Sequence, residues 1–514
     1  MKTTTLTLVH YCGLILLSCC GIFYALQLFD YGYIHGDEGI ALMGGWRVSQ
    51  GQIPHRDFFE FFPPFSFLLT ALFFKLFGTG FFAERLLVMA YAVLLILASD
   101  HLLRHFTKAL TARCLVASFL IPYGVLQWPL PSHHWVVDIA QLLALSALIC
   151  GLKRPPLLWG GLAGVLTALG CFSMQDQGGY LVITLILFFF PWIKAKEIRN
   201  RLFLGWAMGN VLVAALFAIY LLPHVSLTEL IYQWVIFPAT RYDRVAGNVG
   251  SLTSLGLQEI GTPGWFEYLR NFPDYTLPQT AIAVLLPALP LLGVTVIGLE
   301  LVRKRHPKPM LGLLAAGGLA FMGGCLHRFA QTNLVWAAPM LMIILAVGIG
   351  GYLDDGNRWQ QRAAQIFALG IISLSLVYAE GNLRLKLTTD TVQVTGAAGA
   401  LTVPAGSTES SMQMVIDGIE QAVPKGAPLF CTEYNPMVNF WTQRMNPTRY
   451  NFFISPNFHT KEQSDEVIGT LKQRQDTFIL LFVPLADEND LLGWWAYRNY
   501  RAVWRFPWAL LLNK

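Results

Sequence analysis

The chain has 514 residues, of which 54% are hydrophobic and only 13% are charged. An ordinary soluble domain carries about 25% charged residues, so this composition excludes a wholly soluble protein. The formal net charge of +5 lies mostly between apolar runs, so it bears on membrane topology and does not indicate nucleic-acid binding. The eight cysteines form no CxxC pair, which argues against a zinc or disulfide framework.

Eleven apolar runs predict a polytopic α-helical membrane protein. The first run, 6–29, is long enough at about 1.5 Å per residue to span a bilayer, and no small-residue cleavage site follows it. The other runs lie near 81–100, 114–130, 135–151, 156–173, 178–193, 203–222, 278–302, 309–326, 332–351 and 363–379. Charged residues return at ordinary density after 379, so we expect a membrane domain over 1–379 and a soluble domain over 380–514.

The positive charges predict the orientation of these spans. With the N-terminus inside, the loops 101–113, 152–156, 194–201, 303–308 and 352–362 hold 15 Lys or Arg in 43 residues. The opposite loops hold 7 in 119 residues. The positive-inside rule therefore indicates a multi-pass protein of the bacterial inner membrane with external loops at 30–80 and 223–277. If the apolar segment 61–77 were a span, every later loop would change sides of the membrane and the basic loops would lie outside. We therefore predict an interfacial helix there.

With the N-terminus inside and an odd number of spans, residues 380–514 are expected outside the cytoplasm. Buried strands are expected at 428–434 and 477–484, and amphipathic helices at 409–422 and 461–473. These elements predict a small periplasmic or extracellular α/β domain.

Acidic residues gather in the first external loop. Four carboxylates fall within 24 residues, at Asp37, Glu38, Asp57 and Glu60. Carboxylates at a membrane edge are costly to desolvate, so they normally pair with a cation or take part in chemistry. The alternative is that Asp37 and Glu38 form a solvated C-terminal turn of the first span.

The order of motifs in this loop resembles the GT-C glycosyltransferases. After the Asp-Glu pair come Gly45-Trp46-Arg47 through Pro54, an acidic aromatic stretch into Pro63-Pro64, then Lys75-Leu76-Phe77-Gly78 and Glu84-Arg85-Leu86. Within that superfamily the chain is most similar to the group of protein O-mannosyltransferases and lipid A aminoarabinose transferases. The resemblance is dense over 30–90 and elsewhere follows helix count and domain order.

The resemblance implies an inverting enzyme that transfers a hexosyl or pentosyl unit from a polyprenyl-phosphate donor to a lipid, glycan or protein acceptor. An acceptor hydroxyl needs a base when it attacks, and Asp37, with Glu38 beside it, is the expected catalytic carboxylate. By resemblance, Glu60 is expected to help hold a divalent metal ion, which the family pattern leaves open as Mg²⁺, Mn²⁺ or Zn²⁺. The related transferases carry a Lys between this Glu and the Pro, and this chain does not.

Another cation must then bind the donor phosphate. We expect donor-phosphate or substrate contacts from Arg56, Asp57, Asp138, Arg241, Arg244 and Arg328. The alternative for these arginines is that they face water or lipid headgroups. His133 and His134 lie directly before the fourth run, where they either bind metal, with Asp138 completing a site that faces Asp37, or form a capping or hydrogen-bonding feature.

Three other functions fit parts of the sequence. A transporter or lipid flippase suits the many helices, but it predicts charged residues in the middle of the spans, and these are nearly absent. An O-antigen polymerase or ligase would place its key loop late in the chain. A membrane scaffold for a binding domain leaves the carboxylates of the first loop unexplained.

Overall fold

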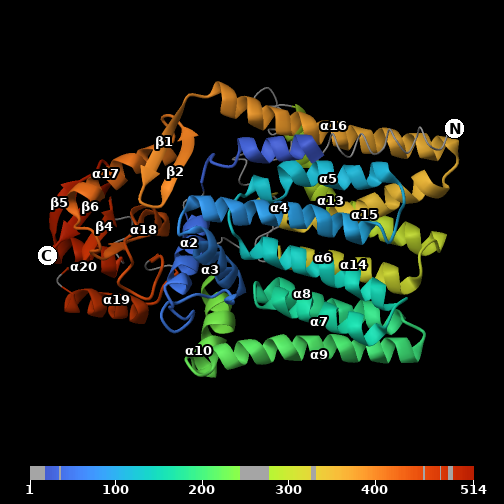
Figure 1. Ribbon diagram of the computed structural model, residues 1–514, viewed down its shortest axis with the longest axis horizontal. Coiled ribbons are helices and arrows are strands. Elements are labelled where there is room, and N and C mark those ends of the chain that lie inside the picture. The colour runs from blue at the N-terminus through green and yellow to red at the C-terminus, as the bar shows by residue number, and fades with distance from the viewer. Residues whose placement is uncertain are drawn as a thin grey trace.

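The computed structural model describes residues 18–33, 36–242, 277–325, 331–454, 458–474, 476–483 and 490–514. A bundle of helices that run along the long axis forms most of the molecule, and a smaller mixed domain lies at one end of the bundle (Figure 1). Among the described residues, seven helices are long and apolar enough to cross a membrane. The expected multi-pass helical architecture is therefore confirmed.

The seven spans correspond one to one to predicted apolar runs. They are carried by α4 (Phe81–Leu103), α5 (Leu110–Tyr123) with its 3-10 extension, α6 (His133–Gly151), α9 (Lys196–Leu221), α13 (Leu277–Arg303), α15 (Gln331–Asp355) and α16 (Arg358–Thr388). Two shorter apolar helices, α7 (Pro156–Cys171) and α14 (Lys308–Gly323), match two further runs. The run 178–193 forms α8 (Gln175–Thr184) and a π-helical turn (Leu185–Phe189). The first run lies largely outside the described residues, so the count of eleven stays a prediction.

Burial divides the bundle into a core and a lipid-facing surface. Helix α15 is the central element, because 94% of its most apolar window is buried inside the protein, against 22% for α13. Large apolar side chains on the outer helices are open, such as Val302 at 80% and Ile219 at 72%. Such an apolar exterior is stable in hydrocarbon and not in water.

Small residues allow α7 and α9 to pack closely. A Cβ atom added to Gly164 would lie 2.0 Å from the Trp206 carbonyl oxygen, and one added to Gly209 would lie 2.2 Å from the Gly161 carbonyl oxygen. Glycine at four-residue spacing is typical of close helix pairs in membranes, since backbones then approach without side chains between them.

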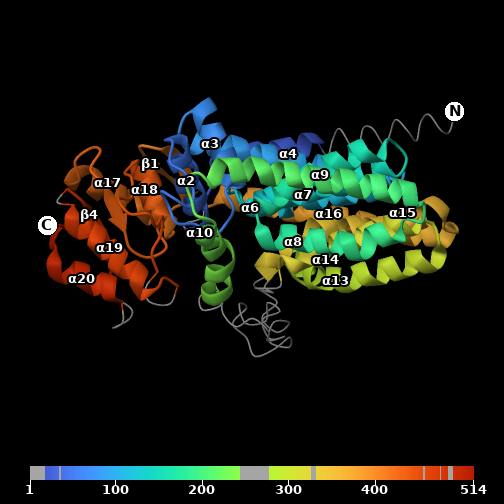
Figure 2. The same ribbon diagram turned by 90° about the horizontal axis from the view of Figure 1, so that it is seen from below.

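Two helices of the first predicted external loop lie across the end of the bundle that faces the C-terminal domain (Figures 1 and 2). They are α2 (Gly36–Ser49) and α3 (Phe65–Phe77), and they pack on each other through Gly44 and Gly45. An added Cβ at Gly44 would lie 2.4 Å from the Phe67 ring. Helix α3 has only 13 residues, which suits the predicted interfacial position better than a span.

All strands of the described chain follow α16. A hairpin of β1 (Thr391–Gly396) and β2 (Gly399–Pro404) precedes a four-stranded sheet with the order β3-β4-β6-β5. Its strands are β3 (Leu429–Cys431), β4 (Phe478–Phe482), β5 (Arg501–Arg505) and β6 (Ala509–Asn513). Strands β3 and β4 are parallel, and the other pairs are antiparallel.

Helices α17 (Met412–Ala422), α18 (Pro436–Thr442), α19 (Lys461–Gln473) and α20 (Leu491–Asn499) complete this region. The prediction of a helix over 461–473 matches α19 to the residue, because a capping box at Thr460 and Gln463 defines its start. The two predicted strands fall on β3 and β4.

The basic connections predicted inside the cell meet at the opposite end of the bundle. Asp354, after α15, accepts a hydrogen bond from Thr107 at 2.8 Å and pairs with Arg305 at 2.7 Å. Three connections, after α4, after α13 and after α15, are thereby joined at this end. The acidic loop and the C-terminal domain lie at the other.

Candidate functional site

The first turn of α2 carries the Asp-Glu pair. The alternative that these residues form the C-terminal turn of the first span is wrong, because they begin a helix of their own. Carboxylates are favourable at a helix N-terminus, where backbone N–H groups carry partial positive charge. The Tyr434 hydroxyl donates a hydrogen bond to Asp37 Oδ1. A Cβ added to Gly36 would fall 1.7 Å from the Tyr434 ring, so only glycine allows this approach.

Asp37 lines a cavity of about 140 Å³ between the end of the bundle and the C-terminal domain. The cavity is bordered by α2, the Phe61–Phe62 segment, the start of α6 and Trp336 of α15. Its polar lining residues are Asp37, Ser66, Ser132, His133, His134 and Tyr434. The structure thus brings together three predicted site residues, namely Asp37 and both histidines.

Aromatic stacking holds the two histidines. The His133 ring stacks on Phe62 with centroids 3.7 Å apart, and His134 stacks on Trp336 at 4.3 Å. Ser132 caps the helix by accepting the His134 backbone N–H at 3.2 Å. The capping function that sequence suggested for the histidines belongs to Ser132, which leaves both rings on the cavity wall.

Glu60 lies directly before this aromatic wall and is buried. Its Oε1 atom accepts the Phe61 backbone N–H at 2.9 Å, and its Oε2 atom is buried with no hydrogen-bond partner in the described part of the chain. Burial raises the pKa of the Glu60 carboxyl to about 8, although two backbone N–H groups oppose the shift. A buried carboxylate with an unused oxygen suits a cation as its partner.

A polar network beside Glu60 joins the first loop to the helix that begins with α10 (Leu227–Ile231). Figure 2 shows this helix standing away from the bundle. His55 Nδ1 lies 2.9 Å from Gln233 Oε1, and the Trp234 indole donates to His55 Nε2 at 3.2 Å. Arg449 of the C-terminal domain completes the network through a 2.9 Å ion pair with Glu229. Burial lowers the pKa of His55 to about 4, so its ring is neutral near pH 7.

Glu38 has a different environment from Asp37. Its side chain is fully buried and forms an ion pair with Arg85 at 3.2 Å. Arg85 also pairs with Glu84 at 3.1 Å and donates to the Gly32 carbonyl at 2.7 Å. The cluster ties α2 to α4 and holds the first turn of α2 in place, while Asp37 stays open to the cavity.

Asp138 is buried within α6, one turn below the histidines. Gln177 donates to its Oδ1 atom at 2.7 Å, and its Oδ2 atom has no hydrogen-bond partner among the described residues. Gln141 extends the network by donating to the Gln177 carbonyl at 2.9 Å. Asp138 does not belong to the lining of the Asp37 cavity.

The predicted arginine contacts are dispersed. Arg56 and Asp57 pair with each other at 2.7 Å and line a separate cavity, and this pairing lowers the pKa of Asp57. Arg241 lies on the π-helical turn Pro238–Tyr242, half-exposed. Arg244 and Arg328 lie outside the described residues.

One group of three His, Cys, Asp or Glu residues has ligand atoms within 4.8 Å of one another in the described part of the chain. It comprises His101, His105 and Cys150, at the end of the bundle with the basic connections. Glu60, His133 and His134 do not form such a group, so their metal-binding function stays a prediction.

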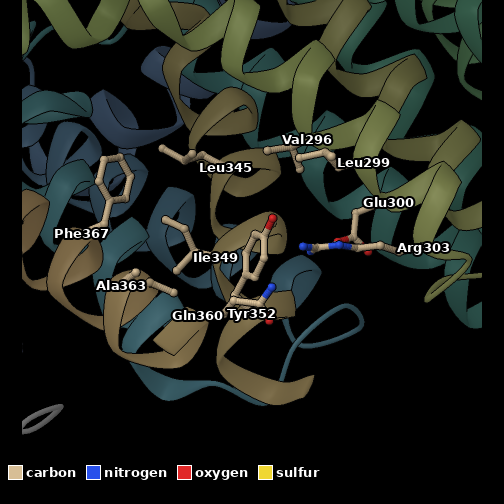
Figure 3. Close-up of a pocket in the computed structure, with 12 residues that line it drawn as sticks. Val296, Leu299, Glu300, Arg303, Leu345, Ile349, Tyr352, Gln360, Ala363 and Phe367 are labelled. Carbon is tan, nitrogen blue, oxygen red and sulfur yellow. The ribbon is translucent and has the colours of Figure 1, made fainter. Parts of the chain in front are cut away.

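A larger apolar cavity of about 320 Å³ lies between α13, α15 and α16. Its polar end holds Glu300 and Arg303, and the Arg303 guanidinium lies 3.7 Å from the Tyr352 ring centroid (Figure 3). Tyr352 is 16 residues beyond Trp336 on α15, about 24 Å along the helix at 1.5 Å per residue. This cavity is therefore remote from Asp37, and its charged groups already contact one another.

Sequence reasoning missed Tyr434 and Trp336. Tyr434 is the last residue of the strand expected at 428–434, so the pattern assigned it to a buried strand and not to a site. The polar stretch Glu433-Tyr434-Asn435 after β3 was the available signal, since side chains beyond a strand end often reach a site.

The fold of the chain is similar to that of solved GT-C membrane glycosyltransferases. ArnT from Cupriavidus metallidurans bound to undecaprenyl phosphate has a TM-score of 0.61 at 13% identity, and the match covers 97% of each chain. The apo form of the same ArnT matches at 0.60. An oligosaccharyltransferase from Archaeoglobus fulgidus matches at 0.57 with 12% identity, covering 92% of this chain and 69% of that one.

No protein-family model and no curated protein sequence matches the chain. At these identities the structural likeness establishes the fold alone. The resemblance expected from the 30–90 motifs is confirmed at that level, since both matched proteins are GT-C glycosyltransferases.

Proposed function

We propose that this protein is an inverting glycosyltransferase that moves a hexosyl or pentosyl unit from a polyprenyl-phosphate donor to a lipid, glycan or protein acceptor. The observation that carries the proposal is the Asp37 carboxylate, which lines a cavity and accepts a hydrogen bond from Tyr434. The matched ArnT structure holds undecaprenyl phosphate, and an archaeal oligosaccharyltransferase of TM-score 0.50 holds a dolichol-phosphate. Both support a polyprenyl-phosphate donor for this fold.

Asp37 would act as the general base. An acceptor hydroxyl is a poor nucleophile at neutral pH, so a carboxylate must take its proton as the oxygen attacks the anomeric carbon. The new bond joins the acceptor oxygen to that carbon, while the bond from the carbon to the phosphate oxygen breaks. A single displacement of this kind inverts the anomeric configuration. The Tyr434 hydroxyl orients the carboxylate, and the Glu38–Arg85 pair positions the helix turn that bears it.

The leaving polyprenyl phosphate carries the electron pair away and needs hydrogen-bond donors. His133 and His134 are the described side chains of the cavity best suited to supply them. Glu60, with its unused Oε2, is the residue best suited to bind a divalent metal ion, and one matched oligosaccharyltransferase structure is a complex with zinc and sulfate. The described residues present no group of three such ligands at this cavity, so metal binding by Glu60 is part of the proposal.

The orientation follows from charge. The basic connections lie at one end of the bundle and the Asp37 cavity at the other, and under the positive-inside rule this supports an orientation with Asp37 and the C-terminal α/β domain outside the cytoplasm. Transfer would then occur at the outer face of the bacterial inner membrane.

The proposal is tested by incubating purified wild type and Asp37→Asn with polyprenyl-phosphate sugars and a panel of membrane acceptors. Loss of a general base predicts a fall in turnover of about 10²- to 10⁴-fold. Asp30→Asn is the matched control, because Asp30 is an exposed carboxylate near the same end that pairs with Lys386. Full activity in Asp37→Asn contradicts the mechanism. Substrate movement across proteoliposomes without any glycosylated product would instead support the alternative of a transporter or lipid flippase.

A further inference from the structure

A cluster of metal-binding side chains lies at the end of the bundle that carries the basic connections. Its members are His101 on the last turn of α4, His105 just after that helix and Cys150 near the end of α6. One ligand atom from each residue lies within 4.8 Å of the other two. His101 is 16 residues beyond Arg85 along α4, about 24 Å at 1.5 Å per residue, so the cluster is remote from the Asp37 cavity.

The two histidines lie on one face of the chain at the end of α4. Residues four apart on a helix are neighbours on its surface, and the His105 backbone N–H continues the turn by donating to the Leu102 carbonyl at 3.2 Å. The ring centroids are 5.4 Å apart. His101 is exposed, whereas the Nε2 atom of His105 is shielded from solvent and has no hydrogen-bond partner among the described residues. A shielded ring nitrogen without a partner needs an explanation, and a bound cation is one that fits.

Cys150 is directed toward α4 by the packing of the next residue, Gly151. A Cβ atom added to Gly151 would lie 2.4 Å from Leu202 Cδ1 and 3.2 Å from Trp159 Cβ, so this residue faces α9 and α7. Successive residues of a helix are turned by about 100°, which directs the Cys150 side chain away from that contact. The Cys150 carbonyl accepts the Arg154 backbone N–H at 2.9 Å, and this bond closes the last turn of α6. The thiol is thereby held, half-buried, beside the histidines.

The ligand types in this cluster select zinc. Within the described residues no carboxylate joins the cluster, and the neighbouring Asp100 is already paired with Arg104 at 2.5 Å and Arg113 at 2.6 Å. Mg²⁺ and Ca²⁺ need oxygen ligands, so they do not fit. Two imidazoles and one thiolate suit Zn²⁺, with the fourth tetrahedral position left for water. Lys153 and Arg154 follow Cys150 but are exposed, so solvent and salt screen their repulsion of a cation.

We infer that His101, His105 and Cys150 form a binding site for a zinc ion. A tetrahedral zinc ion with bonds of about 2.0–2.3 Å requires ligand atoms about 3.4–3.6 Å apart. The spacing of up to 4.8 Å must therefore shorten by about 1 Å, which the exposed His101 ring can provide by rotating. The ion would join the end of α4 to the end of α6 and stabilise this end of the bundle. The site is separate from any metal at Glu60 and does not depend on glycosyl transfer.

Zinc is counted first, in the full chain in detergent, without a polyhistidine tag and with Glu60→Gln so that Glu60 contributes no metal. After equilibration with Zn²⁺ and removal of the excess, plasma mass spectrometry should find one zinc per chain in this parent protein. Loss of an outer-shell partner weakens metal binding by about 10- to 100-fold, so loss of a direct ligand in His101→Ala or Cys150→Ser should cost at least about 100-fold. His101 is exposed, so its variant should fold. Cys114→Ser is the matched control, because Cys114 is half-buried on α5 and outside the cluster.

Cobalt replaces zinc in the second measurement, because a thiolate ligand gives Co²⁺ a charge-transfer absorption in the near ultraviolet. We expect this band in the parent protein and in Cys114→Ser, and its loss in Cys150→Ser. Zn²⁺ should also raise the midpoint of thermal unfolding of the parent protein and not that of His101→Ala. The site is overturned if the parent protein holds no zinc, if Cys150→Ser holds as much, if cobalt binds without the band, or if Zn²⁺ shifts both midpoints equally.

Discussion

The contact between Tyr434 and Asp37 joins two parts of the chain 397 residues apart, and Tyr434→Phe removes it with little change in shape. A hydrogen bond to a charged group contributes about 1.5–3 kcal/mol when it is sheltered from solvent. Asp37 is exposed to the cavity, so water can replace part of this contact. We therefore expect the lower end of that range, which corresponds to a fall of about tenfold in kcat/KM.

A double-mutant cycle decides how Tyr434 acts. If the hydroxyl works only by orienting Asp37, Tyr434→Phe should cost about tenfold in the wild type and less than about twofold in an Asp37→Asn background. Initial rates of transfer from a radiolabelled polyprenyl-phosphate sugar provide the assay. Tyr497→Phe is the control, since Tyr497 lies exposed on α20. An equal loss in both backgrounds, or no loss in either, refutes the assignment of Tyr434 as a positioning residue.

Three further predictions concern stability and metal. Replacing Arg85 by Met leaves Glu38 and Glu84 buried without a cation, so it should lower the free energy of unfolding by about 3–5 kcal/mol. A midpoint of thermal unfolding in detergent equal to that of wild type would contradict this prediction. Burial lowers the pKa of His459 to about 3, so the folded state excludes the proton that the unfolded chain binds below about pH 6.5. Stability should therefore be complete above that pH and fall by about 2 kcal/mol on going to about pH 5, and His459→Gln should flatten this part of the profile; an unchanged slope is the contrary result. Complete removal of divalent metal should lower the transfer activity of wild type and have little effect on that of Glu60→Gln. Adding Mg²⁺, Mn²⁺ or Zn²⁺ back should restore activity in wild type alone. Wild-type activity that survives chelation shows that Glu60 is not a metal ligand.

Local sequence patterns were sufficient for much of the architecture. The spans carry long apolar runs because each must satisfy its backbone within a helix in lipid, and such runs are visible without tertiary information. Helix α19 was predicted to the residue from its amphipathic pattern. The 30–90 motifs indicated the GT-C fold, which the structural matches bear out.

The partners of the carboxylates depended on the tertiary fold. Asp37 and Glu38 are adjacent in sequence and chemically alike, yet one faces a cavity and the other is buried against Arg85. Helical geometry turns neighbouring side chains by about 100°, so the face that each presents depends on what packs against α2.

The apolar composition and the acidic first loop were therefore sufficient to predict a polytopic membrane protein with a cluster of carboxylates at one end. The sequence could not show which distant groups surround those carboxylates, because Tyr434 reaches Asp37 from the C-terminal domain and Trp336 lines the same cavity from α15, hundreds of residues away. Such contacts arise only when the C-terminal domain packs against α2 and the bundle. Packing of this kind between separate parts of the chain leaves no periodic signal in either.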